Sequence, residues 1–257
     1  MSTRLQGRRA LVTGASSGIG REVAVRFAAE GAAVACGGRD EGRTRDTVDR
    51  ITAAGGTAVA VVGDVSQPEG AQAVVEAAAE ALGGIDAVIN NAGIDATEWK
   101  NVADWPVDEF DELLRTNLRG PFLVAKYSIP HMLEAGGGAI VHMSSVCAIT
   151  VWAGDCGYDI SKAGLNMLSD HIAVEYGPQG IRSNTLMPGV IATELHESVM
   201  VAMDDGRAFE RELLSRHPIG RFGDVTEVAD ACVFLCANEA GFLTGANISI
   251  DGGYSRV

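Results

Sequence analysis

The chain has 257 residues, of which 47% are hydrophobic and 21% are charged, and its formal net charge is -14. That length suits one α/β domain and is long enough to bury a substantial core. The negative charge argues against binding to nucleic acid or to an anionic membrane, because both favour a basic protein surface.

Seven short apolar runs are predicted to form strands, with helical stretches between most of them. The runs are residues 10–13, 34–36, 58–62, 87–90, 139–143, 182–187 and 247–250. Strands that alternate with helices predict an α/β fold with a Rossmann-type, doubly wound parallel sheet of about seven strands and helices on both faces. We expect a single domain over residues 1–257, with ligands bound at the carboxyl ends of the strands.

The first predicted strand leads into a glycine-rich turn, residues 13–20, with the sequence Thr-Gly-Ala-Ser-Ser-Gly-Ile-Gly. A helix-like segment at residues 22–28 follows, so the turn has the strand–turn–helix context of a dinucleotide site. Gly14, Gly18 and Gly20 permit a tight turn and a close approach of the backbone to a pyrophosphate at the helix N-terminus. Their spacing, Gly-x-x-x-Gly-x-Gly, differs from the commoner Gly-x-Gly-x-x-Gly fingerprint.

Tyr158 and Lys162 are four residues apart, and Ser145 precedes the tyrosine by thirteen residues. Residues four apart lie on one face of a helix, so the ammonium group can stabilise a phenolate. A free phenol has a pKa of about 10 and must be shifted to roughly 7 to exchange protons easily at neutral pH, and we expect Lys162 to lower it. Ser145 would hydrogen-bond the substrate oxygen where negative charge develops. With the glycine turn, these residues predict hydride transfer between a nicotinamide and a carbonyl or alcohol.

These motifs occur in the order typical of the short-chain dehydrogenase/reductase (SDR) family, which the chain resembles along essentially its whole length. The matching residues are Thr13-Gly14-x-x-x-Gly18-x-Gly20, Asp64-Val65, Asn90-Asn91-Ala92-Gly93, Asn117, Ser145, Tyr158, Lys162, Pro188-Gly189 and Thr193. Chance agreement at that many ordered positions is negligible. The resemblance implies an oxidoreductase that interconverts a ketone or aldehyde and an alcohol, with Tyr158 as general acid/base.

The resemblance also implies roles for individual residues. Asn117 would complete a catalytic set with Ser145, Tyr158 and Lys162 by holding a water that passes protons to the lysine. The implied cofactor-binding residues are Gly14, Ser16, Ser17, Gly18, Ile19, Gly20, Arg39, Asp64, Val65, Asn90, Asn91, Ala92, Gly93, Tyr158, Lys162, Pro188, Gly189, Ile191 and Thr193. Two of these residues have structural alternatives. Asp64 could cap the helix that begins near Pro68, and Asn117 could stabilise a kink in its own helix.

The end of the second predicted strand bears on which dinucleotide binds. An acidic residue there would accept hydrogen bonds from a free ribose 2′-hydroxyl, but Gly38 aligns with the acidic position of the family. Arg39 follows directly and Arg43 lies one turn further on, so a guanidinium group could hold a 2′-phosphate. This pattern favours NADP(H), and the adjacent Asp40 keeps NAD(H) as the alternative. Both arginines could instead be solvated charges at the start of a helix.

Residues 190–218 depart from the simple alternation, and in the SDR family the corresponding stretch is a mobile substrate lid. An amphipathic helical excursion that covers the core is compatible with that interpretation. The expected substrate pocket comprises Ser145, Cys147, Trp152, Tyr158, Leu195 and His196. Its largely apolar lining favours a hydrophobic carbonyl compound over a polyol, although Asp155 and His196 could recognise hydroxyls.

Other functions are weighed against this one. Reduction of 3-oxoacyl groups on acyl carrier protein needs basic residues to dock an acidic carrier, and residues 131–136 contain no Lys or Arg while Gln179 stands where a basic residue is often found. Arg119 and Arg182 keep this alternative open. A non-catalytic NADP(H)-binding sensor or a subunit of a larger reductase is a further alternative, against which the intact acid/base set argues.

The chain has no apolar stretch of about 18 residues and no signal-peptide pattern, since Arg4, Arg8 and Arg9 lead directly into the first strand. Its five cysteines form no Cys-x-x-Cys pair, and its five histidines lack ligand spacing. We therefore expect a cytoplasmic protein without a metal site. By resemblance to the family we also expect a homotetramer that acts on a small molecule.

Overall fold

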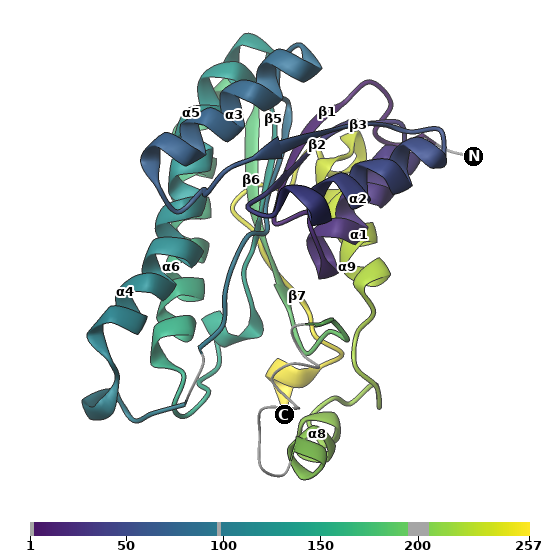
Figure 1. Ribbon diagram of the computed structural model, residues 1–257. Coiled ribbons are helices and arrows are strands. Elements are labelled where there is room, and N and C mark those ends of the chain that lie inside the picture. Colours follow the sequence, from purple (N-terminus) through teal and green to yellow (C-terminus); the bar gives the residue numbers. More distant parts are fainter. Residues whose placement is uncertain (1–2, 97–98, 195–205) are drawn as a thin grey trace.

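The computed structural model describes residues 3–96, 99–194 and 206–257. Its centre is a seven-stranded sheet in the order β3-β2-β1-β4-β5-β6-β7, in which every neighbouring pair is parallel (Figure 1). The strands are β1 (Arg9–Thr13), β2 (Ala33–Gly38), β3 (Thr57–Val62), β4 (Ala87–Asn90), β5 (Gly138–Met143), β6 (Ile181–Pro188) and β7 (Asn247–Ile250). The predicted fold class is confirmed, and each predicted strand lies within an observed one.

Helices cover both faces of the sheet (Figure 1). On one face lie α1 (Gly18–Ala29), α2 (Glu41–Ala53) and α9 (Val225–Cys236), and on the other lie α3 (Pro68–Leu82), α5 (Gly120–Glu134) and α6 (Cys156–Tyr176). Two separate apolar cores result. Along β1, Ala10 and Val12 belong to the first core and Leu11 belongs to the second, because successive side chains of a strand point to opposite faces.

The connections between the strands and the C-terminal tail carry the shorter elements. These are η1 (Val102–Asp104), α4 (Val107–Leu114), the π-helical turn η2 (Arg115–Arg119), η3 (Val146–Ala148), η4 (Gly177–Gln179), α8 (Gly206–Ser215), η5 (Asn238–Ala240) and η6 (Tyr254–Arg256). Figure 1 shows α8 beyond the carboxyl end of the sheet, near the C-terminus. In the part of the chain that the structure describes, no helix is both long and apolar enough to cross a membrane.

Candidate active site

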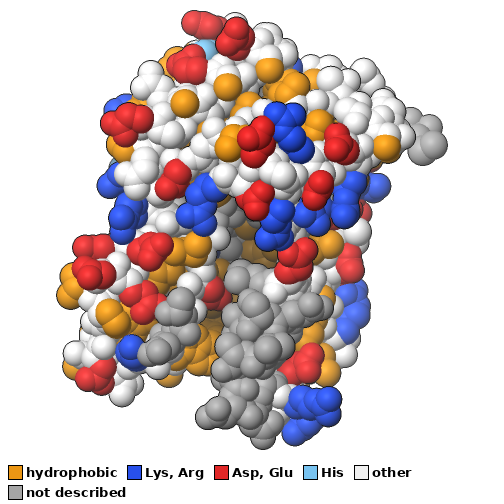
Figure 2. Space-filling model, in the orientation of Figure 1, with side chains coloured by type: hydrophobic (Ala, Val, Ile, Leu, Met, Phe, Trp, Pro, Cys, Tyr) orange, Lys and Arg blue, Asp and Glu red, His pale blue; other side chains and the backbone are white. Residues whose placement is uncertain are grey.

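A cleft of about 530 Å³ opens at the carboxyl ends of β1, β2, β4, β5 and β6. Figure 2 shows the surface hollowed in this region, with apolar side chains inside the hollow and charged ones around it. Most of the residues that the sequence singled out line it: Gly14, Ser16, Ser17, Gly18, Ile19, Arg39, Asp64, Val65, Asn91, Ala92, Gly93, Ser145, Cys147, Trp152, Tyr158, Lys162, Pro188, Gly189, Ile191 and Thr193.

Five predicted residues do not line the cleft or cannot be placed. One of them, Asn117, is fully buried and is described below. Asn90 is buried and points away from it, with its amide donating to the carbonyl of Pro121. Gly20 lies within α1 beneath the turn, where a side chain would collide with the Gly14 carbonyl, so its role is to let helix and turn approach each other. Leu195 and His196 lie outside the described residues.

The turn after β1 is shaped to receive a ligand backbone. Gly14 has a φ of +67°, and a Cβ atom on it would lie 2.8 Å from the Asn91 amide nitrogen. The Thr13 hydroxyl fixes the facing loop by accepting hydrogen bonds from the backbone of Asn91 and Ala92, at 3.0 and 3.1 Å. Only glycine therefore fits at Gly14.

The N-terminus of α1 opens directly into the cleft. Its N-cap residue, Ser17, makes no side-chain capping bond, and the first turn holds no acidic residue. A Cβ atom on Gly18 would be 3.8 Å from Thr193 across the cleft, so space remains between the two. Exposed backbone N–H groups and the positive end of the helix dipole bind phosphate well. The residues present therefore fit the pyrophosphate of a dinucleotide.

The charges at the end of β2 separate into a paired set and one unpaired group. The Asp40 carboxylate caps α2 by accepting from the backbone N–H of Arg43 at 3.0 Å. The Arg43 guanidinium donates to Glu194 at 2.6 Å. Arg39 is exposed on the rim of the cleft and makes no hydrogen bond or ion pair with any described residue. A cationic group is thus left for a ligand.

The structure bears on the structural roles considered for Asp64 and Asn117. The N-cap residue of α3 is Gln67, whose side chain makes no capping bond, and the Asp64 carboxylate accepts from the backbone N–H of Ser66 at 3.0 Å. Asp64 therefore orders the turn before the helix. Asn117 lies fully buried in the π-helical turn η2. Its amide pairs with both backbone groups of Ile94 at 2.8 Å, so it holds the loop after β4 and not its own helix.

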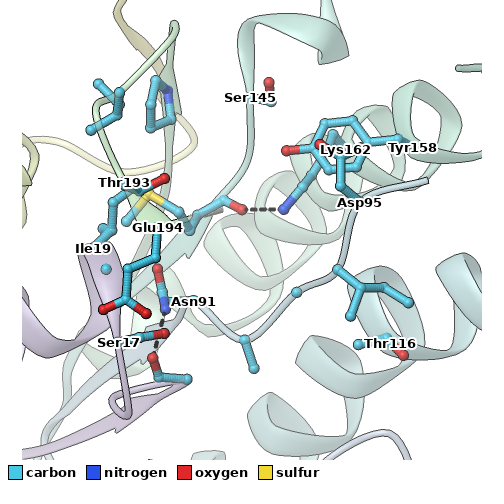
Figure 3. A pocket seen from close by; sticks show the side chains of 18 of the residues that line it. Ser17, Ile19, Asn91, Asp95, Thr116, Ser145, Tyr158, Lys162, Thr193 and Glu194 are labelled. Carbon is cyan, nitrogen blue, oxygen red and sulfur yellow. Dashed lines mark hydrogen bonds between the residues drawn. The ribbon is translucent and has the colours of Figure 1, made fainter. Parts of the chain in front are cut away.

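Ser145, Tyr158 and Lys162 converge on one wall of the cleft, opposite the glycine turn (Figure 3). Ser145 follows β5 and lies within hydrogen-bonding reach of the Tyr158 hydroxyl. The Lys162 ammonium donates to the Met143 carbonyl at 2.9 Å and lies 5.3 Å from the centre of the Tyr158 ring. Because Tyr158 and Lys162 share one face of α6, the helix sets their separation.

The electrostatics of this wall differ from the sequence expectation. Burial raises the pKa of Tyr158 well above 10, and the negative charge of Asp95 raises it further. Burial also lowers the pKa of Lys162 to about 8, which Asp95 opposes. The expected net shift of the phenol pKa toward 7 is therefore wrong for the chain's own groups, because desolvation dominates. The contribution of Lys162 stays a prediction. At neutral pH the Tyr158 phenol is therefore protonated and can donate a proton.

Aromatic rings form the other end of the cleft. Trp99, Trp152 and Phe209 contact one another edge to face, with ring centres 5.2 to 6.2 Å apart. Trp152 also stacks on Tyr254 at 6.0 Å. We call Trp99, Trp152 and Phe209 the aromatic wall. Of these, the expected substrate pocket included only Trp152, because nothing in the local sequence shows that Trp99 and Phe209 meet it.

No group of three His, Cys, Asp or Glu side chains among the described residues is arranged to hold a metal ion. All five cysteines are unpaired thiols. Burial raises the pKa of Cys147, beside Ser145, to about 12, so this thiol is not an activated nucleophile. The groups that the cleft does present are the hydroxyls of Ser145 and Tyr158 and the ammonium of Lys162.

Comparisons with known proteins agree with this geometry. A family model described as enoyl-(acyl carrier protein) reductase matches residues 14–255. The L-rhamnose 1-dehydrogenase (NAD(P)(+)) of Azotobacter vinelandii is 38% identical over 248 residues, covering 95% of this chain and 94% of that protein. The 2,5-dichloro-2,5-cyclohexadiene-1,4-diol dehydrogenase of Sphingobium indicum is 33% identical over 258 residues, covering 99% of both.

Solved structures give the same answer. A short-chain type dehydrogenase/reductase from Mycobacterium marinum superposes with a TM-score of 0.92 at 34% identity, covering 99% of this chain and 98% of that one. A structure from Agrobacterium tumefaciens with bound NADP gives a TM-score of 0.88 at 31% identity, covering 98% of both chains. With the fold and the ordered motifs, these matches mean that the chain belongs to the short-chain dehydrogenase/reductase family, oxidoreductases that act on alcohols and carbonyl compounds.

Proposed function

We propose that this protein is an NADP(H)-dependent oxidoreductase that interconverts a ketone or aldehyde and an alcohol, with Tyr158 as general acid/base. The observation that carries the proposal is the convergence of Ser145, Tyr158 and Lys162 on the wall that faces the glycine turn. A nicotinamide cofactor, when bound, supplies or accepts the hydride. The chain's own residues handle the proton and the orientation of the substrate.

Each polar group on that wall has a distinct task. The protonated Tyr158 hydroxyl donates to the substrate oxygen in the reducing direction and takes the proton back in the oxidising direction. The Ser145 hydroxyl is a second, neutral donor to the same oxygen. Lys162 is held by the Met143 carbonyl. Asn117 acts as a positioning residue through the Ile94 backbone.

NADP(H) is favoured over NAD(H) by the end of β2. Arg39 is unengaged by the described residues, and Asp40 is committed to capping α2. A guanidinium at this place can form a bidentate contact with a 2′-phosphate, whereas the Asp40 carboxylate accepts from the backbone of α2. A relative named for both NAD and NADP and a neighbour with bound NADP are in keeping with this choice.

The substrate is proposed to be a medium-sized ring alcohol or ketone. The aromatic wall gives a flat apolar surface, and two relatives are named for a sugar and for a cyclohexadiene diol. We propose that residues 190–218 act as the lid, since Phe209 and Leu213 on α8 line the cleft. A lid needs such an apolar underside.

Reduction of 3-oxoacyl carrier protein is the second candidate. The description of the matching family model names the same kind of carrier, although the enoyl group it names is reduced at a C=C bond and not at a carbonyl. Arg182, one of two basic residues that could dock a carrier, is used internally: its guanidinium donates to the carbonyls of Leu243 and Ala237. Arg119 alone remains exposed. Comparing kcat/KM for a free cyclic ketone with that for acetoacetyl carrier protein separates the two candidates.

The proposal is tested by following NADPH and NADH with purified protein and a panel of ring ketones and alcohols. Turnover that is faster with NADPH supports it. Tight NADPH binding without turnover across the panel would favour a sensor or a subunit of a larger reductase instead.

We further propose a homotetramer in a reducing, cytoplasmic setting. Phe122 on α5 and Met167 on α6 are 47% and 59% exposed, which gives these helices an apolar outer surface suited to subunit contact. Light scattering of the purified chain gives the subunit number directly.

A further inference from the structure

Two carboxyl groups, those of Asp95 and Asp155, meet at the substrate end of the cleft and take no part in the chemistry proposed above. Asp95 follows the loop held by Asn117, and Figure 3 shows it beside Tyr158 and Lys162. Asp155 precedes the first residue of α6, three positions before Tyr158, so both side chains lie on the same side of that helix. The two carboxyls are near enough for each to change the ionisation of the other.

Burying the Asp155 carboxyl without a hydrogen-bond partner costs free energy. It is only 4% exposed, it makes no side-chain capping bond to α6, and its Oδ1 atom has no hydrogen-bond partner among the residues that the structure describes. Buried polar atoms of native proteins are nearly always paired, so an orphaned oxygen in the wall of a cleft points to a group that a ligand supplies.

The charge of Asp95 and Asp155 indicates which kind of ligand group they can bind. Burial raises the pKa of both carboxyls, and the neighbouring charges of Asp95 and Asp159 raise the pKa of Asp155 further, to about 8. The pair therefore holds one proton between its two carboxyls at neutral pH. The ammonium of Lys162 balances Asp95. The other titratable groups that face the pair are Tyr158, Asp159, Cys147 and Cys156. A neutral ligand is preferred, since a second cation would require Asp155 to ionise.

A protonated carboxyl donates one hydrogen bond and an ionised one only accepts, so the pair offers both functions side by side. A hydroxyl group is the neutral ligand that both donates and accepts. We propose that Asp95 and Asp155 bind a second hydroxyl of the substrate, close to the one that reacts, so that the substrate class is a ring alcohol or ketone carrying another hydroxyl. This inference rests on the proposed function and narrows its substrate.

The test compares three kinds of alcohol that share one ring: cyclohexanol, the cyclohexane diols and 2-aminocyclohexanol. At least one diol should exceed cyclohexanol in kcat/KM by about tenfold or more, because a site built for a hydroxyl rejects the analogue that lacks it. Asp155→Leu should lower kcat/KM for that diol by about 10- to 100-fold and change that for cyclohexanol by less than about threefold. Asp95→Asn, which keeps the shape, serves as the second variant if Asp155→Leu does not fold.

Asp159→Asn is the matched control, since it removes a nearby charge while keeping an oxygen that can accept from the Trp152 backbone. It should leave the diol preference in place. Equal kcat/KM for cyclohexanol and every diol would overturn the inference while leaving the proposed function intact. A preference for 2-aminocyclohexanol would overturn it in favour of an ammonium site. No turnover of any ring alcohol or ketone would defeat the proposed function itself.

Discussion

The two ends of the cleft are built in different ways. The cofactor end consists of backbone turns and small side chains at the strand ends, such as Gly14, Ser17 and Thr193. The substrate end consists of large aromatic and acidic side chains, such as Trp99, Asp155 and Phe209, that come from three segments far apart in the chain. A dinucleotide is bound by a fixed backbone shape, whereas a substrate is selected by side chains that can be exchanged without changing the fold.

The largest expected effect is a loss of kcat when Tyr158, which lies between the cofactor end and the substrate end, is replaced. Tyr158→Phe should lower kcat by about a thousandfold, because the proton donor is lost, and should change the Kd for NADPH by less than about threefold. Stopped-flow turnover and fluorescence titration give the two values. Tyr176→Phe, at the end of the same helix, is the control and should keep full activity. If Tyr158→Phe keeps most of its kcat, the acid/base role belongs to another group.

The next effect probes the cofactor end alone. Arg39→Ala should raise the Kd for NADPH by about 10- to 100-fold, since a hydrogen bond to a charged phosphate is lost, while the Kd for NADH changes by less than about threefold. Arg45→Ala is the matched control, because Arg45 pairs with Glu41 on the outer surface of α2. Equal losses for the two dinucleotides would contradict the assignment of the 2′-phosphate site.

At the substrate end, Asp155 should make the free energy of unfolding depend on pH. Asp155 has a folded pKa of about 8 against an ordinary value near 4, so the folded state binds its proton more tightly. Its contribution is fully present below about pH 4 and is lost as the pH rises toward 8, at a rate of about 1 kcal/mol per pH unit.

Urea unfolding at several pH values between about 5 and 8 measures how steeply the free energy of unfolding changes with pH below the pKa of Asp155. Asp155→Asn should make the free energy of unfolding less dependent on pH in this interval. Asp49→Asn, an exposed acid on α2, should leave the dependence as it is in the original protein. An unchanged slope in Asp155→Asn would mean that this carboxyl is ionised in the folded state.

The smallest expected effect concerns the ion pairs of Glu194 at the rim of the cofactor site. Glu194 pairs with Arg43 at 2.6 Å and with Arg21 at 3.8 Å, so it ties the segment after β6 to the rim of the cofactor site. Glu194→Gln should raise the affinity for NADPH by about two- to threefold, because a carboxylate near the 2′-phosphate is removed and exposed ion pairs contribute little. Glu41→Gln is the control, and weaker NADPH binding in Glu194→Gln would contradict this interpretation.

The same division explains what the sequence could predict. The seven strands and the glycine turn follow from local patterns, since buried parallel strands are continuous apolar runs and a tight turn needs glycine. Asp95 and Trp99 follow a recognisable motif, yet nothing local shows that they meet Asp155 and Phe209. The raised pKa of Tyr158 could not be predicted either, because burial and the charge of Asp95 depend on the packed cleft.

The central claim is that the two ends cooperate in hydride transfer, and an isotope label tests it most directly. NADPH deuterated at the transferring carbon of its nicotinamide is incubated with a ring ketone and the protein, and the product is analysed by NMR. We expect deuterium on the carbinol carbon of the alcohol, and labelled alcohol formed about a thousandfold more slowly with Tyr158→Phe at equal NADPH occupancy. Alcohol formed without deuterium from either labelled face of the nicotinamide would contradict it.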